Sequence, residues 1–233
     1  MLGKYFRGNT LLNGLVAYWK LEESSGTRVD ATGRGNDLAP QATPGNTTGR
    51  VGNAVQLTSA SSQFLNSAST ADLTMGDFDF TFAFWVWGDT VTPQKYAMSK
   101  WTSSGVEEYS VLIDTGNRFK FYIANFAKVV SADNFGAPSI STWYFVVCQH
   151  DAANDLIKIS VNDGTMNTAA TAGAFPAVGV EGFAIGSAKS SAFNVGWNGR
   201  IDEFGIWKRL LTAAEITSMY NGGSGITYPF IGT

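Results

Sequence analysis

The sequence contains one cysteine and one histidine among 233 residues, and this scarcity excludes several kinds of chemistry. Cys148 cannot form an internal disulfide, and in its apolar run it is expected to be a small core residue. His150 confines any Ser-His-Asp or Cys-His catalysis to one position. Its turn-like surroundings predict an exposed residue without a catalytic role. The sequence also has no cysteine or histidine cluster suited to zinc.

Charged residues make up only 15% of the sequence, with 16 basic and 19 acidic residues, a net charge of −3 and no long run of either sign. A protein that follows nucleic-acid phosphates needs a basic patch or stripe, so we exclude nucleic acid as a partner. No apolar run approaches the ~18 residues of a membrane span, which argues against membrane insertion.

Residues 1–8 lack the apolar core of about 7–15 residues that a secretory signal peptide needs. We therefore expect a protein that is made in the cytoplasm. It acts either inside the cell or at an extracellular or virion surface that it reaches by another route, such as release within an assembled particle.

What the sequence does contain is aromatic residues (13%), 26 glycines and apolar residues at alternate positions. Phe80 to Trp87 is apolar on both faces and should be a central strand. The turn residues 114–117 and 162–164 predict hairpins. About a dozen candidate strands and one helix at 213–220 predict an all-β fold, a two-sheet antiparallel jelly-roll sandwich with one short C-terminal helix.

The segment from Gly199 to Asn221 combines a strand with that helix. Strict alternation places Ile201, Glu203, Gly205 and Trp207 on one face of the strand and Asp202, Phe204, Ile206 and Lys208 on the other. Thr212 and Glu215 have the spacing of a capping box, and Asn221-Gly222 supplies a left-handed helix ending.

Several segments then occur in a familiar order: Gly14–Gly26, Asp30–Asp37, Gly49–Leu57, Phe80–Val86, Trp143–Asp151, Ile185–Ser187 and Gly199–Asn221. Together they resemble the laminin-G-like, concanavalin A-type jelly-roll family of lectins and glucanases. The resemblance implies one domain over residues 14–233, preceded by an arm at residues 1–13. It also implies a module that binds glycans, proteins or calcium and is usually not catalytic, although a related group hydrolyses glucans.

Glucan hydrolysis needs two carboxyl groups facing each other across a cleft. On one strand they can stand at i and i+4, and no predicted strand carries acids at that spacing. Asp202 and Glu203 are adjacent, so alternation points them to opposite faces, and the same holds for Glu107 and Glu108. We therefore predict that the protein is not an enzyme.

The loop from Asp30 to Asp37 offers carboxylate and amide oxygens of the kind that calcium prefers. The resemblance implies that a calcium ion ties this region to the closing strand. The predicted ligands are Asp30, Asn36 and Asp202, assisted by Glu22 or Glu23. Alternatively, Asp30 and Asn36 cap turns, and Asp202 accepts backbone hydrogen bonds.

Trp85 and Trp87 share one face of the predicted central strand, with Trp101 and Tyr122 as candidate neighbours. Such rings can form a floor on which sugars stack. The alternative is that loops cover them and that they form a second core layer.

Two classes of function stay open. The first is a carbohydrate-binding or adhesive module that recognises a glycan or a surface protein. The second is a purely structural virion protein, a phage capsid-decorating or tail component, whose arm (residues 1–13) docks on phage capsid or tail proteins.

Overall fold

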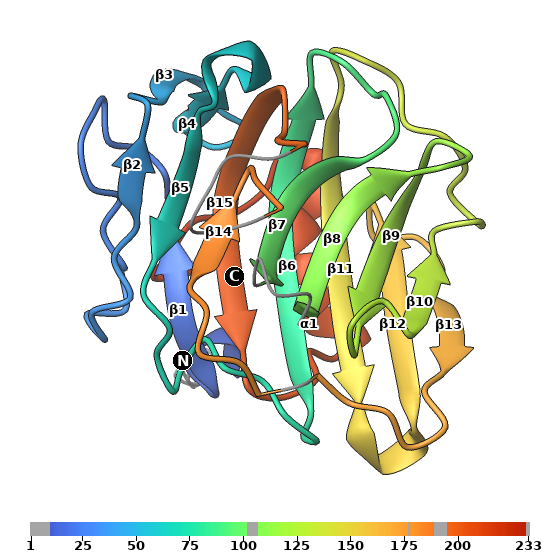
Figure 1. Cartoon of the computed structure of the whole chain (residues 1–233). Helices are drawn as coiled ribbons and strands as arrows, with labels where there is room; N and C mark the ends of the chain where they lie inside the picture. Colours follow the sequence, from blue (N-terminus) through green and yellow to red (C-terminus); the bar gives the residue numbers. More distant parts are fainter. Residues whose placement is uncertain (1–9, 102–106, 177, 189–194, 232–233) are drawn as a thin grey trace, which may run out of the picture.

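Two antiparallel β-sheets packed face to face make up the computed structural model, which describes residues 10–101, 107–176, 178–188 and 195–231 (Figure 1). One α-helix, α1 (Ala213–Tyr220), lies outside them. The predicted antiparallel jelly-roll sandwich with a short C-terminal helix is therefore confirmed.

The first sheet has eight strands, and β1 joins it by pairing with β15. Its order is β13 (Asn167–Ala170), β12 (Leu156–Val161), β11 (Trp143–Asp151), β6 (Phe80–Gly88), β15 (Gly199–Trp207), β4 (Asn53–Leu57) and β3 (Gly45–Thr48), with β1 at Leu15–Trp19. Because β6 lies between β11 and β15, the prediction of a central strand is confirmed.

The second sheet has seven strands. Its order is β10 (Lys128–Ser131), β9 (Arg118–Ile123), β8 (Glu107–Asp114), β7 (Lys95–Trp101), β14 (Phe183–Ile185), β5 (Phe64–Ser67) and β2 (Ala39–Gln41). In the residues that the structure describes, the other elements are the 3₁₀ turns η1 (Thr10–Leu12), η2 (Ser59–Ser61), η3 (Ala152–Asn154) and η4 (Asn221–Gly223). Both predicted hairpins, β8–β9 and β12–β13, are present.

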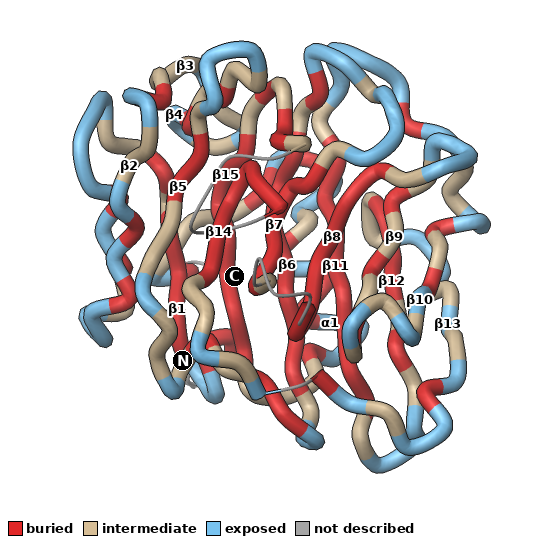
Figure 2. The backbone as a smooth tube through the Cα atoms, in the orientation of Figure 1, coloured by how far each residue is buried: buried red, intermediate tan, exposed pale blue. Residues whose placement is uncertain are grey.

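The main core lies between the sheets, where inner strands such as β6 and β11 are buried along most of their length, whereas the edge strands β2, β3, β10 and β13 are not (Figure 2). Phe82 contacts Tyr109 with ring centroids 4.8 Å apart, and Phe84 stacks on Phe204 at 4.7 Å. Burying each such side chain contributes about 1.5–3 kcal/mol. Cys148 is fully buried in this core, as predicted, and burial raises the pKa of its thiol.

A second apolar layer lies on the outer face of the eight-stranded sheet, beneath α1. The helix begins at a capping box between Thr212 and Glu215 and ends at Asn221 in the left-handed conformation, as its sequence predicts. Ile216 and Met219 are buried against this layer. The C-terminal part of the chain therefore covers the outer face of the eight-stranded sheet around Trp85. From the sequence, this face could have been either a floor for sugars or a second core layer.

A β-bulge interrupts β15 at Glu203, which has a φ of 48°. Ile201 and Phe204 both face the main core, so the predicted strict alternation along this strand is wrong. The extra residue lets Asp202 and Glu203 turn toward the same outer face, where Asp202 pairs in register with Trp85 and Glu203 contacts Tyr18.

The described part of the N-terminal arm is attached to the sandwich. Leu11 is buried, and its carbonyl accepts a hydrogen bond from Trp207 Nε1 at 2.7 Å. Arg209 donates to the carbonyls of Thr10 and Asn13. Residues 1–9, which carry most of the predicted docking arm, lie outside the described residues.

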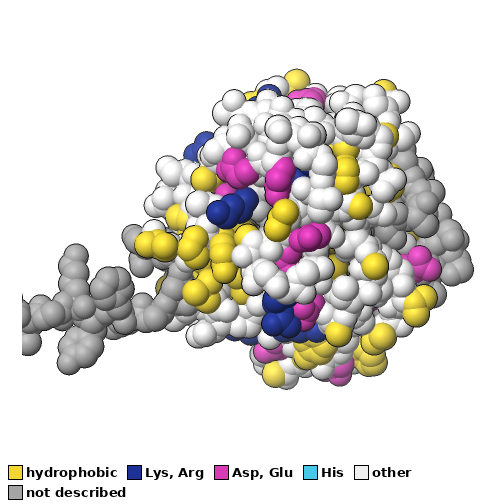
Figure 3. Space-filling model, turned by 90° about the vertical axis from the view of Figure 1, so that its left-hand side faces the viewer, with side chains coloured by type: hydrophobic (Ala, Val, Ile, Leu, Met, Phe, Trp, Pro, Cys, Tyr) yellow, Lys and Arg dark blue, Asp and Glu magenta, His cyan; other side chains and the backbone are white. Residues whose placement is uncertain are grey.

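Acidic and basic side chains are scattered over the face shown in Figure 3, and this face has no continuous basic area. Among the described residues, no helix combines the length and the apolar character needed to cross a membrane.

Candidate functional site

Four aromatic side chains gather on the outer face of the seven-stranded sheet, and we call them the aromatic patch: Tyr96, Trp101, Tyr122 and Phe126. Tyr96 stacks on Trp101 with centroids 6.3 Å apart. Phe126 stands edge-on to Trp101 at 5.4 Å and to Tyr122 at 5.5 Å. Tyr96 is nearly buried, whereas the other three rings are half-buried and keep part of their surface in solvent.

Two carboxyl groups lie among these rings. Glu107 is buried and accepts hydrogen bonds from Ser110 Oγ and from the Phe126 backbone N–H. Burial raises its pKa to about 7, although both hydrogen bonds act in the opposite direction. Asp114 accepts from the Tyr122 hydroxyl and from Lys120 Nζ. Although burial works against ionisation, these donors hold the pKa of Asp114 below its usual value.

Local irregularities of the chain place these groups. The pairing of β7 with β8 shifts between Lys100 and Trp101, so Trp101 stands opposite Glu107. The turn after β9 then runs through Ala124, Asn125 and Phe126, which all have positive φ angles of 56–61°. This turn directs the Phe126 ring back over the sheet toward Trp101.

Trp85 and Trp87 lie on the outer face of the other sheet, so the prediction that Trp101 and Tyr122 are their neighbours is wrong. Trp85 is 2% exposed, because Tyr220 stacks on its ring at 5.7 Å and the Arg50 guanidinium lies 5.2 Å above it. Trp85 therefore belongs to a second core layer, which was the alternative prediction for this residue. Trp87 is half-buried beneath Arg200.

The four predicted calcium ligands do not form one ligand set. Asp30 and Asn36 bond to each other at 3.2–3.3 Å, and Asp30 also accepts from the backbone N–H groups of Tyr18 and Thr32. Both Asp30 oxygens are therefore engaged in holding the loop. Among the described residues, no group of three acidic, histidine or cysteine side chains is arranged to hold a metal ion.

Glu22 and Asp202 instead hold the turn at residues 49–53. Asp202 Oδ2 accepts from the backbone N–H groups of Arg50 at 2.7 Å and Val51 at 2.9 Å, and Glu22 Oε2 accepts from Asn53 at 2.8 Å. The role of Asp202 is the one that the sequence left open as the alternative, whereas the bond of Glu22 to Asn53 was not predicted. Asp30, Asn36, Asp202 and Glu22 therefore do not form the ligand set that was predicted for calcium.

His150 is buried, which corrects the prediction of an exposed turn residue. Its Nδ1 lies 2.9 Å from the Phe78 carbonyl oxygen, and its ring stacks on Phe80 at 5.2 Å. The contacts with Phe78 and Phe80 therefore fix the position of the His150 ring.

Asp202 and Glu203 face the same side because of the bulge, so their predicted separation onto opposite faces is also wrong. Burial raises the pKa of Asp202 to about 8 and that of Glu203 to about 7. They are 0% and 1% exposed, respectively. A glycan cannot reach carboxyl groups so completely covered, and the pair is not placed across a cleft as glycoside hydrolysis requires.

Residues 58–217 match the family model Laminin_G_3, described as the concanavalin A-like lectin/glucanases superfamily. The chain belongs to this superfamily. No curated protein matches the sequence of this concanavalin A-like domain.

Solved structures share the fold at low identity. Domain 4 of AbnA, a GH43 extracellular arabinanase from Geobacillus stearothermophilus solved with arabinotriose, is 18% identical with a TM-score of 0.68, over 87% of this chain and 96% of that one. The binding domain of Paraclostridial Mosquitocidal Protein 1 is 15% identical with a TM-score of 0.70. The botulinum neurotoxin serotype G binding domain is 14% identical with a TM-score of 0.65. Those two alignments cover 90% and 88% of this chain, and only about half of each toxin chain (52% and 50%).

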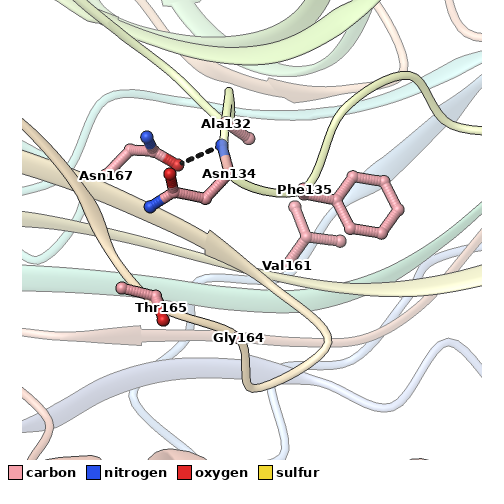
Figure 4. A pocket seen from close by; sticks show the side chains of 7 residues that line it. All are labelled: Ala132, Asn134, Phe135, Val161, Gly164, Thr165 and Asn167. Atoms are coloured by element: carbon pink, nitrogen blue, oxygen red, sulfur yellow. Dashed lines mark hydrogen bonds between the residues drawn. The ribbon is translucent and has the colours of Figure 1, made fainter.

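The concanavalin A-like domain has another candidate surface where the edge strands β10 and β13 approach each other. Figure 4 shows a pocket of about 380 Å³ there, with Asn134 and Asn167 on one side and Phe135 and Val161 on the other. The backbone N–H of Asn134 donates to Asn167 Oδ1 at 3.1 Å. None of the seven lining residues is charged. Phe135 is its one aromatic residue, so this pocket offers a smaller stacking surface than the aromatic patch.

Sequence reasoning found Trp101 and Tyr122 but missed Tyr96, Glu107 and Phe126. A signal for Tyr96 was present, because it lies in the same short segment as Trp101. Phe126 follows a strand end without glycine or proline, so the sequence has no strong turn signal there.

Proposed function

We propose that this domain is a non-catalytic surface-recognition module that binds a glycan on the aromatic patch. The observation that carries the proposal is the cluster of half-buried rings, Trp101, Tyr122 and Phe126, set beside the polar groups of Asp114 and Lys120. Sugars place their C–H faces on such rings while carboxylates, hydroxyls and amines fix their hydroxyl groups.

The comparisons support a binding role at the level of the fold. The similar structures include toxin binding domains and an arabinanase domain solved with arabinotriose. The absence of charge runs and the burial of Asp202 and Glu203 agree with a binding module.

A glycan array screened with the purified chain tests the proposal. We expect reproducible binding to a defined glycan group, weakened about twofold to tenfold by Trp101→Ala, because stacking on one ring contributes about 0.5–1.5 kcal/mol. Trp87→Ala is the matched control, since Trp87 is also a half-buried tryptophan but lies on the other sheet. Loss of binding in Trp87→Ala, with binding kept in Trp101→Ala, would show that the ligand binds the eight-stranded sheet and would overturn the proposal.

The alternative from the sequence, a structural component of a phage virion, stays a prediction, as does a location at an extracellular or virion surface. A folded protein that binds no glycan on the array would favour it. Deleting residues 1–9 and measuring incorporation into particles then tests the docking role of the arm, and unchanged incorporation would exclude that role.

A further inference from the structure

Glu107 lies beneath the aromatic patch with its side chain 0% exposed. Its Oε2 accepts a 2.7 Å hydrogen bond from the backbone N–H of Phe126. Its Oε1 accepts a hydrogen bond from the hydroxyl of Ser110 on the same strand. Both carboxyl oxygens therefore have a donor, and one donor belongs to the residue that forms the edge of the patch.

The backbone of Glu107 holds the same turn. Its carbonyl accepts a 2.8 Å hydrogen bond from the Asn125 N–H, and its own N–H donates to Asn125 Oδ1 at 3.3 Å. Three hydrogen bonds thus join one residue of β8 to the turn of residues 124–126. Those three residues are non-glycine residues in the left-handed region, a conformation that persists only where the surroundings enforce it.

Phe126 connects these hydrogen bonds to the aromatic patch, because its ring contacts both Trp101 and Tyr122. Its ring meets Trp101 at an interplanar angle of 88° and Tyr122 at 66°, so it lies between the two rings that the proposed function places against a ligand. A displaced Phe126 would leave Trp101 and Tyr122 without the ring that packs against both.

We propose that Glu107 is the positioning residue of the aromatic patch: its ionised carboxylate holds Phe126 against Trp101 and Tyr122, and a proton on Glu107 weakens that hold and with it the binding of a glycan. The effect on a ligand rests on the proposed function. The hold on Phe126 can be tested without any ligand.

Glu107 gains or loses its proton near neutral pH, because burial raises its pKa. Tyr96 faces it from β7, Asp114 lies on its own strand, and Tyr122 and Lys120 come from β9. Burial raises the pKa of both tyrosines, so they stay neutral. Donors from Tyr122 and Lys120 keep Asp114 ionised. With its pKa raised to about 7 by burial, Glu107 changes charge between pH 6 and pH 8, whereas Asp114 and the two tyrosines keep theirs.

The ionised and the protonated states of Glu107 differ in two hydrogen bonds, the one with Ser110 and the one with Phe126. An ionised carboxylate accepts a charge-assisted hydrogen bond, which is about twice as strong as a neutral one. A proton taken from solvent can sit on Oε1 and donate to the Ser110 hydroxyl, which can also act as an acceptor. Oε2 then accepts from Phe126 as a neutral carbonyl, and the bond weakens. Glutamine reproduces this neutral state, with its carbonyl toward Phe126 and its amide toward Ser110.

The first test is an NMR titration of protein labelled with ¹⁵N-phenylalanine, from pH 5.5 to pH 8.5. We expect the Phe126 amide resonance to titrate with a midpoint near pH 7 and to stay constant in Glu107→Gln. Asp133→Asn, which removes an acid that is 71% exposed, should titrate as the wild type does. A Phe126 amide that does not titrate, or that titrates equally in Glu107→Gln, would overturn the proposal.

The second test measures the affinity for a glycan identified on the array at pH 6 and pH 8. We expect severalfold tighter binding at pH 8 in the wild type, and the weaker affinity at both pH values in Glu107→Gln. Phe126→Leu keeps the backbone N–H, so the residue-126 amide, observed in this variant by labelling with ¹⁵N-leucine, should still titrate while binding weakens. Equal wild-type affinity at both pH values would overturn the link to binding. If the array is blank, the proposed function fails, and the NMR titration still decides whether Glu107 holds Phe126.

Discussion

The hydroxyl of Tyr18 donates a 2.6 Å hydrogen bond to Glu203, the residue at which β15 bulges. Both side chains are buried, and 185 residues of sequence separate them. The bond joins β1 to β15 on the outer face of the eight-stranded sheet and satisfies one oxygen of a carboxyl group that the bulge turns into an apolar layer.

Tyr18→Phe should therefore destabilise the domain by about 1–3 kcal/mol, because it leaves a buried carboxyl oxygen without its donor. Urea unfolding at pH 7 measures the change. Tyr220→Phe is the matched control, since Tyr220 is half-buried and its change should stay within about 0.5 kcal/mol. Equal stability of Tyr18→Phe and the wild type would show that the bond is energetically unimportant.

The regular parts of the fold could be predicted from the sequence because their signals are local. The alternation from Phe80 to Trp87 and the Thr212–Glu215 capping box act over a few residues, and the structure has both. The bulge could not be predicted, since Glu203 adopts a left-handed conformation without a glycine or asparagine to mark it.

The candidate site could be predicted only in part, for a related reason. Trp101 and Tyr122 are aromatic residues on predicted strands, and the structure brings them together around Phe126. Which sheet they share, and which tryptophan is covered, depends on contacts between residues far apart in the chain. Tyr220 over Trp85 is such a contact, and no local pattern contains it.

Trp85→Ala should destabilise the domain by about 3–5 kcal/mol, because it removes a large side chain that is packed against Phe145 and Tyr220. Trp101→Ala should cost less, since part of its ring is already in solvent. Guanidinium unfolding of both variants checks the order. A smaller loss of stability for Trp85→Ala than for Trp101→Ala would mean that the C-terminal segment does not seal Trp85 in solution.

Calcium binding stays a prediction, and its effect on stability can be measured directly. For a dissociation constant of ~0.1 mM, which is within the range of extracellular modules, ~1 mM calcium adds about 1.4 kcal/mol of stability by linkage. Unfolding midpoints in calcium and in chelator test this. Because the four predicted ligands do not converge, a positive result should survive Asp30→Asn, and its loss in that variant would restore the predicted site.

Glu215 makes the stability of the domain sensitive to acid. Its carboxylate accepts two hydrogen bonds of 2.8 Å from Arg209 and one of 2.9 Å from the backbone N–H of Thr212. Although burial acts in the opposite direction, these donors lower the pKa of Glu215 to about 2 in the folded protein, from an ordinary value of 4.5. The folded state therefore binds this proton more weakly than the unfolded state does, and the stabilisation is complete above about pH 4.5 and lost as the pH falls toward 2.

Glu215→Gln keeps a capping side chain at the helix start but removes the charge. We expect it to be about 2 kcal/mol less stable than the wild type at pH 7, the contribution of hydrogen bonds to a charged group. The difference should shrink as the pH falls from 4.5 toward 2, because the wild type then loses the same charge. Urea unfolding of both proteins at pH 7, 4.5 and 3 measures it, with Asp77→Asn, which removes an exposed acid, as the control for the loss of one negative charge. A difference that stays constant from pH 7 to pH 3 would mean that the Arg209–Glu215 pair does not depress the pKa of Glu215 in solution.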